Sequence, residues 1–190
     1  MTFVETSSAF VEAWKLSGQF LVQTLTAFAR HPGIILLYAA PPATERAWVL
    51  LRTKPVPAWW LPSLEALIIL WRFVMLGIAI WIVLPPPEMV RLQKAFESNA
   101  VIQDKLNHLG ENLGKHLRQL TWEIIFFAIV FFLLVWLFDR GARLWMQGLD
   151  LPQVTKDNQR MALAVVARNL LLYPIALMYA VVLIRHYLIT

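Results

Sequence analysis

Three long runs of apolar residues lie along the chain, at 66–84, 120–138 and 161–184. Each is close to the roughly 20 residues that an α-helix needs to cross the hydrocarbon core of a bilayer. Three consecutive prolines follow the first run and end it abruptly. The pattern therefore predicts an all-α integral membrane protein with about three transmembrane helices.

The N-terminal segment, residues 3–30, has a helical and two-faced pattern instead. Polar and apolar side chains recur in separate stripes, at steps of three, four and seven. Such an amphipathic helix lies in the headgroup plane or packs on a partner subunit, and the sequence leaves both open. Because its first charges are acidic, we expect no cleavable signal peptide or presequence. The polar stripe is Glu12, Lys15, Gln19, Gln23 and Arg30, and the apolar stripe is Phe10, Trp14, Leu21, Leu25 and Phe28.

Proline and tryptophan dominate the region that follows. His31-Pro32-Gly33 ends the first helix, and the apolar stretch 34–40 is too short to span a bilayer alone. The prolines of residues 41–62 predict an interrupted linker that lies on the membrane surface. We therefore expect an interfacial helix and Pro/Trp-rich linker at 1–64 and a membrane domain at 65–190. The N-terminal region also offers a fourth span.

A polar segment with a heptad pattern, residues 88–119, separates the first two spans. Its seam positions alternate in steps of three and four, which is typical of a helical hairpin or coiled coil. An amphipathic helix folded onto the membrane surface is the alternative. Gly110 and Gly114 weaken the helix and favour a break there. We interpret the segment as an extramembrane docking surface, with candidate partner-interface residues Leu92, Ile102, Leu106, Leu109 and Leu113.

Composition agrees with a membrane protein. Hydrophobic residues make up 59% of the chain and charged residues 15%, with a mean hydropathy of +0.59. The absence of cysteine excludes disulfides, thiolate metal sites and a cysteine nucleophile. A net charge of +5 would point to nucleic acid in a soluble domain. In a membrane protein we interpret the basic residues as topology signals, and we expect no nucleic-acid partner.

Lysine and arginine are unevenly distributed between the two sides of the predicted membrane. With three spans, more of them fall on the side of the N-terminus than on that of the heptad segment and the C-terminus. The positive-inside rule therefore predicts a cytoplasmic N-terminus. In general outline the architecture resembles accessory subunits of large bacterial membrane assemblies, although no motif carries the likeness. On that basis we expect a bacterial inner membrane.

Two arginines inside the predicted spans are the most informative polar residues. Arg72 and Arg168 lie roughly 10 Å below the cytoplasmic boundary. An arginine at such a depth is costly unless it snorkels or pairs. Asp139 ends the second span at the same end and is geometrically able to pair with Arg168. These three residues are a candidate lipid-headgroup or ion-pair site, and snorkelling is the alternative.

Sets of catalytic residues are nearly absent. The histidines are scattered, and no metalloprotease, nucleophile-elbow or Walker pattern occurs. Glu123 could serve a proton path, although a Glu near a span end more often marks the interface. Pro174 should kink the third span, which favours a packing bend over a substrate site. We expect no enzyme activity, no cofactor and no metal.

These features favour a non-catalytic, multi-pass subunit or scaffold of a larger membrane complex. Its expected partners are lipids and other membrane-protein subunits, or copies of itself, held through the amphipathic and heptad-like helices. The alternative is a small transporter or lipid-handling protein that uses Arg72, Arg168 and the kink at Pro174.

Overall fold

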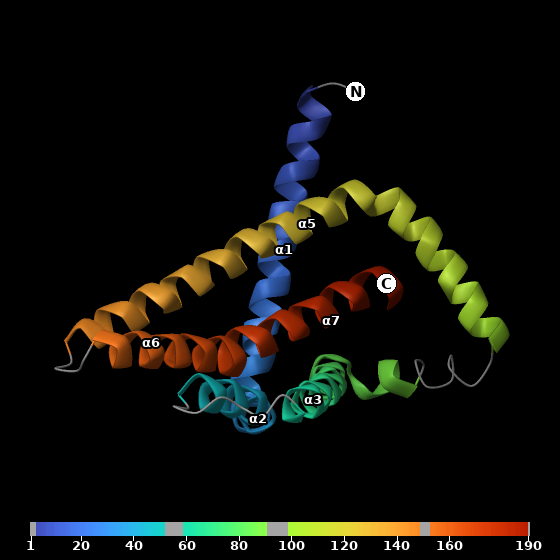
Figure 1. Ribbon diagram of the computed structural model, residues 1–190. Coiled ribbons are helices and arrows are strands. Elements are labelled where there is room, and N and C mark those ends of the chain that lie inside the picture. Colours follow the sequence, from blue (N-terminus) through green and yellow to red (C-terminus); the bar gives the residue numbers. More distant parts are fainter. Residues whose placement is uncertain (1–2, 52–58, 91–98, 149–152, 190) are drawn as a thin grey trace. The chain divides into compact units, whose positions relative to one another are not determined.

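The computed structural model describes residues 3–51, 59–90, 99–148 and 153–189, and its regular elements are all helical in this part of the chain. The all-α prediction is confirmed for these residues. In chain order the elements are α1 (Phe3–Arg30), α2 (Pro32–Leu51), α3 (Trp60–Val83), α5 (Asn99–Gln147), α6 (Gln153–Ala167), the π-helical turn η1 (Arg168–Leu172) and α7 (Tyr173–Ile189) (Figure 1).

Three stretches of helix in the described residues are long and apolar enough to cross a membrane. They are Pro62–Val83, His116–Gln147 and Asp157–Tyr187, and they coincide with the three predicted apolar runs. The third stretch combines α6, η1 and α7. Helices α1 and α2 pass the same test only together, across the break at His31, so the number rises to four if that pair forms one span.

The heptad segment is continuous with the second span. Helix α5 begins at Asn99 and runs without a break into the apolar stretch that starts at His116. Figure 1 shows it as one ribbon that changes direction but does not end. The predicted break at Gly110 and Gly114 is therefore wrong. Glycine costs only about 1 kcal/mol per position in a helix, and cooperative hydrogen bonding on both sides outweighs that cost.

The prolines of α2 do not interrupt it, contrary to the prediction of a linker. The helix is continuous, with Pro41 and Pro42 in its interior. Because Pro42 has no N–H, the carbonyl of Tyr38 loses its helical partner. The Trp71 indole Nε1 of α3 donates a hydrogen bond of 2.6 Å to that carbonyl oxygen instead. A donor from another helix thus compensates for the proline, and only residues 52–58 of the predicted linker lie outside the described residues.

Replacing Trp71 by phenylalanine should destabilise the fold by about 1–3 kcal/mol, because the Tyr38 carbonyl is then left buried without a donor. In a Pro42→Ala background the restored N–H satisfies the carbonyl, so the same substitution should cost much less. Thermal unfolding of the four proteins of this double-mutant cycle, in one detergent, measures the difference. An equal cost in both backgrounds would show that the indole acts through its bulk alone.

The chain forms two compact units. The first comprises Met1–Arg30, Ala79–Val130 and Met178–Thr190, and it brings α1 against parts of α5 and α7. Phe20 of α1 is buried against Tyr179 and Val182 of α7. At the other end of α1, Phe10 and Trp14 meet Trp122 and Phe126 of α5 edge to face, with centroids 5.1 and 4.6 Å apart. Helix α1 therefore packs on its own chain, which neither sequence alternative anticipated.

The second unit comprises His31–Ile78 and Phe131–Leu177, and within it α2 packs against α6 and η1. Small side chains are buried on both helices. Ala39 and Ala43 of α2 have no exposed surface, and Ala162 and Ala164 of α6 are also buried. Small residues allow helices to approach closely, which is the usual packing device between helices in a membrane.

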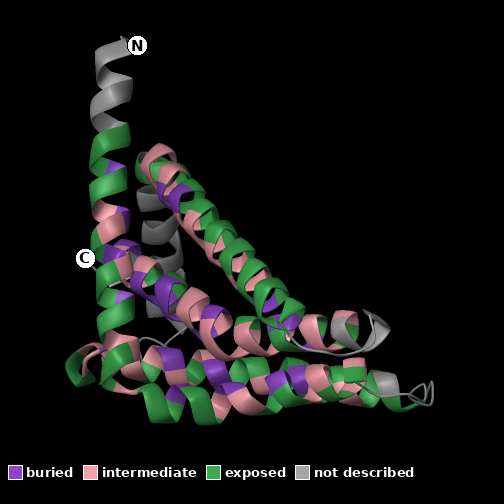
Figure 2. Ribbon diagram, turned by 90° about the vertical axis from the view of Figure 1, so that its left-hand side faces the viewer, coloured by how far each residue is buried: buried purple, intermediate pink, exposed green. Residues whose placement is uncertain are grey.

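Burial follows a pattern typical of helices in lipid. Among the described residues, the side chains with no exposed surface at all are small or polar, although the larger Leu172 and Met178 are also fully buried. Many other large apolar side chains, such as Phe132 (74% exposed) and Phe73 (66% exposed), face outward. Figure 2 shows buried positions as narrow stripes between broad exposed faces. Such a surface would promote aggregation in water, whereas lipid tails would solvate it. The residues with no exposed surface are Ala13, Ser17, Thr24, Ala39, Ala43 and Glu123.

Candidate functional site

Four of the five predicted interface residues share one face of α5. They follow one another in steps of four, three and four in an unbroken helix. Ahead of His116 this part of α5, residues 99–115, extends for roughly 25 Å at 1.5 Å per residue. We call it the α5 arm. Its seam residues are Ile102, Leu106, Leu109 and Leu113, and Leu92 lies outside the described residues.

The three residues predicted to form a lipid or ion-pair site all lie in the second unit. The Arg72 guanidinium lies 5.4 Å from the centroid of the Tyr173 ring, within cation–π range. Asp139 pairs with Arg143, one turn later, at 3.4 Å. Arg168 is exposed and donates from Nε to a backbone carbonyl one turn earlier. Arg168 and Asp139 form no ion pair with each other in the described structure.

The predicted irregularity near Pro174 takes the form of a π-helical turn. The Tyr173 N–H bonds to the carbonyl of Arg168, five residues earlier. Pro174 comes next and has no N–H to donate, so the widened turn occurs where the regular ladder is interrupted. The Asn169 side chain donates to the carbonyl of Val165 at 2.9 Å and satisfies one more backbone group. Turns of this kind are frequent at functional sites.

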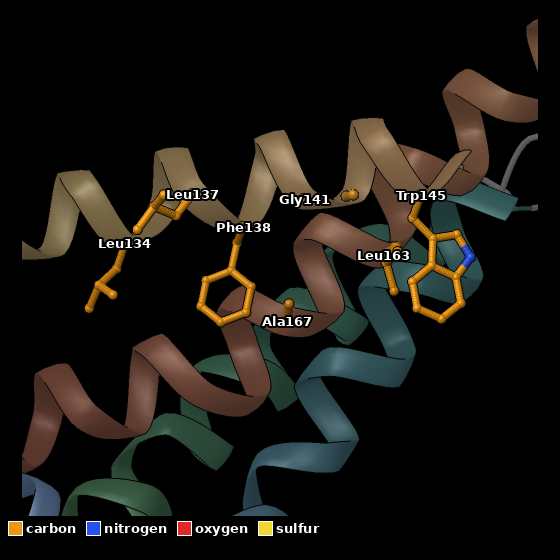
Figure 3. A pocket seen from close by; sticks show the side chains of 8 residues that line it. Leu134, Leu137, Phe138, Gly141, Trp145, Leu163 and Ala167 are labelled. Atoms are coloured by element: carbon orange, nitrogen blue, oxygen red, sulfur yellow. The ribbon is translucent and has the colours of Figure 1, made fainter. Parts of the chain in front are cut away.

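An open apolar groove of about 440 Å³ lies between α5 and α6 in the second unit. Figure 3 shows Phe138 and Trp145 projecting from α5 on either side of Gly141, toward Ala167 and Leu163 of α6. Every side chain that lines it is apolar, and the missing side chain at Gly141 leaves room between the two aromatic rings. The remaining lining residues are Leu134, Leu137 and Ala142.

A buried polar cluster surrounds Glu123 in the first unit. The Glu123 side chain has no exposed surface. Its two carboxyl oxygens each lie 3.0 Å from the Tyr187 hydroxyl of α7, and Oε1 lies 3.3 Å from Nε2 of Gln119. The rings of His116 and Tyr187 are 6.0 Å apart. Among the described residues, no lysine or arginine forms an ion pair with this carboxyl group.

A two-point ion pair joins the segment after α3 to the end of α7. Arg185 Nε lies 2.7 Å from Oε2 of Glu88, and Arg185 Nη2 lies 2.8 Å from Oε1. Both residues belong to the first unit. Paired hydrogen bonds of this geometry are among the stronger contacts between side chains. The pair therefore holds the C-terminal ends of α3 and α7 near one another.

Sequence reasoning found the charged residues but missed their partners. Glu123 was recognisable as an acid in an apolar run, but Tyr187 follows it only 64 positions later. Arg185 and Glu88 are 97 positions apart, and no sequence pattern indicates that the two residues pair. The described residues contain no group of three His, Asp or Glu side chains arranged to hold a metal ion.

Comparisons with protein-family models, curated proteins and solved structures find no match to this chain.

Proposed function

We propose that the protein is a non-catalytic, multi-pass membrane subunit or scaffold that assembles with other membrane proteins, or with copies of itself, in a bacterial inner membrane. The observation that carries this proposal is the α5 arm. Its leucine seam lies on a helix that continues without a break into the second candidate span. In this proposal the bilayer anchors the seam at one end, and an apolar stripe of this pattern is suited to packing against a partner helix.

The weak packing among the candidate spans supports the same role. Only 17%, 11% and 28% of the residues in their apolar windows are buried within the chain. Most of each span is thus free to meet lipid or the helices of other subunits. Exposed aromatic residues such as Trp136 and Trp81 enlarge this apolar surface. Aromatic side chains are favoured both at protein interfaces and at membrane boundaries.

We further propose a cytoplasmic N-terminus, with the α5 arm and the C-terminus on the opposite side. The Glu88–Arg185 pair supports this arrangement, because it holds the ends of α3 and α7 near one another. A chain with three spans needs these two ends on one side of the membrane. The excess of basic residues on the other side gives the direction.

The test is to purify the protein gently from native membranes and to determine the mass of the assembly. We expect a complex of fixed composition, larger than the 21.9 kDa chain. Leu106→Asp combined with Leu113→Asp should reduce it to the single chain, since each buried leucine contributes about 1.5–3 kcal/mol. Membrane insertion should persist, because both positions precede the apolar stretch.

Lys105→Ala combined with Glu111→Ala is the matched control, since both residues lie on the α5 arm but outside the leucine seam. It should leave the complex intact. A complex that survives the double leucine substitution would remove the main support for the scaffold role. Recovery of the wild-type chain alone with tightly bound phospholipid would favour the second candidate instead.

That second candidate is a lipid-handling protein, and the apolar groove between α5 and α6 favours it. An acyl chain is apolar and flexible enough to occupy a groove bordered by Phe138 and Trp145. Arg143 is exposed beside the groove residue Ala142 and would attract an anionic headgroup. Arg168, next to Ala167, would do the same.

A further inference from the structure

Glu123 is a fully buried acid, and no lysine or arginine forms an ion pair with it among the described residues. It lies about 10 Å along the helix from His116, where the second candidate span begins. A carboxylate in an apolar interior is strongly unfavourable unless a cation pairs with it, and such a group binds a proton instead. Glu88 of the same unit differs, because Arg185 neutralises it directly.

The two side chains that contact Glu123 suit both of its charge states. A tyrosine hydroxyl donates a hydrogen bond to a carboxylate and accepts one from a protonated carboxyl group. The contact with Tyr187 can therefore persist at 3.0 Å while the direction of the hydrogen bond reverses. The Gln119 amide likewise offers both donors and an acceptor. An arginine at either position would hold Glu123 in its ionised form.

Two further hydroxyls provide unused hydrogen-bonding capacity in the same cluster. Ser17 of α1 has no exposed surface and Tyr179 of α7 is 2% exposed. The two hydroxyls are neighbours, and Tyr179 lies within electrostatic range of Glu123. Neither oxygen makes a well-formed hydrogen bond in the described structure.

Two imidazoles border the cluster near the ends of the spans. The rings of His116 and His186 lie 6.0 and 5.1 Å from the Tyr187 ring, and His116 is exposed. Imidazole gains and loses protons near neutral pH. The titratable groups around Glu123 are therefore His116 from α5 and Tyr179, His186 and Tyr187 from α7, while α1 contributes the Ser17 hydroxyl.

We propose that Glu123 is a proton-binding site that exchanges with water through Tyr187, at the end of the spans where His116 and His186 lie. On loading, the Tyr187 O–H bond breaks as its proton passes to the carboxylate and forms an O–H bond on Glu123. A hydronium ion or imidazolium gives up a proton that re-forms the Tyr187 hydroxyl, and water or neutral imidazole remains. On unloading the O–H bond on Glu123 breaks and both transfers run in reverse. No electron is transferred. Proton binding is a function additional to the proposed scaffold role and does not depend on it.

The test uses dicyclohexylcarbodiimide, an apolar reagent that adds to protonated carboxyl groups and leaves a stable acylurea. The wild-type protein in lipid nanodiscs is treated at acidic and at alkaline pH, and the adducts are located by peptide mass spectrometry. We expect an adduct on Glu123 at acidic pH and its loss at alkaline pH. Glu88, which Arg185 holds in an ion pair, is the internal control that should stay unmodified. Protection of Glu123 by sodium at constant pH would overturn the proposal in favour of a sodium site.

Infrared spectroscopy covers the case in which the reagent does not reach the cluster. The spectrum of the wild type minus that of Glu123→Gln should contain a protonated carboxyl band at acidic pH, and this difference band should disappear at alkaline pH. Glutamine mimics the neutral acid, so this variant should fold. If neither the adduct nor the band appears, the proposal is overturned.

Removal of the Tyr187 hydroxyl separates proton exchange from a purely structural role. Tyr187→Phe should slow the change of the Glu123 signal after a jump in pH, because the hydroxyl that relays the proton touches both carboxyl oxygens. Tyr38→Phe is the matched control, since Tyr38 belongs to the second unit. An unchanged rate in Tyr187→Phe would overturn the exchange route.

Discussion

Replacing Phe20 by alanine is expected to loosen α1 from the first unit at a cost of about 3–5 kcal/mol. Phe20 is 3% exposed and belongs to the buried core formed with Tyr179 and Val182 of α7. Its ring lies 6.4 Å from the Tyr179 ring and 5.1 Å from the His186 ring. Its buried neighbours on the same face, Ser17 and Thr24, have small side chains. Truncation therefore removes the largest buried side chain of this face and leaves a cavity.

The loss should be visible as a lower midpoint of thermal unfolding in detergent and as faster proteolysis within α1. Val22→Ala is the matched control, because Val22 is on the same helix but 63% exposed. Exposed substitutions of this kind usually change stability by about 0.5 kcal/mol or less. Similar effects of the two substitutions would mean that α1 is not held through Phe20.

The number and place of the candidate spans could be predicted from the sequence because length and apolar composition define them. A helix must be long and continuously apolar to cross a bilayer, and that pattern stands out in a single sequence. The buried face of α1 could not be predicted in the same way. The apolar stripe contained Trp14 and Leu25, which are 44% and 45% exposed, whereas Ala13 and Ser17 on the adjacent face are fully buried. In lipid, apolar character no longer marks the inside of a protein.

Local rules failed where a contact from another part of the chain compensated for them. Proline predicts a helix break, but the Trp71 indole satisfies the Tyr38 carbonyl that Pro42 leaves free. The sequence of α2 does not predict this contact, because Trp71 follows Tyr38 by 33 positions. The break predicted at the glycines of α5 was wrong for a different reason. The free-energy cost of glycine in a helix is small compared with the cooperative stability of a long helix.

The candidate sites were predictable as residues but not as contacts. A charge in an apolar run is visible in the sequence, which is how Arg72, Arg168 and Glu123 were found. Their surroundings depend on which helices meet, and a single sequence does not contain that information. Glu123 therefore received its Tyr187 partner only from the fold, and Asp139 proved to pair with Arg143 rather than with Arg168.

Leucine at positions 39 and 43 should separate α2 from α6, and we expect the second large loss of stability from this pair of substitutions. Ala39 and Ala43 lie one turn apart and have no exposed surface. Helix α6 has its own buried alanines, Ala162 and Ala164. Extra methylene groups in a tightly packed contact cost about 1–3 kcal/mol per site, because neighbouring side chains and backbone must shift.

Thermal unfolding in detergent measures this effect, and Ala66→Leu is the control of matched volume. Ala66 is exposed on α3, within a stretch apolar enough to face lipid, so a leucine there meets no packed neighbour. The control should leave the midpoint nearly unchanged, while Ala39→Leu and Ala43→Leu should each lower it. The double substitution should lower it further, although by less than the sum if one displacement of α2 accommodates both side chains. An unchanged midpoint in the double variant would mean that the two alanines are not held in close contact with neighbouring helices.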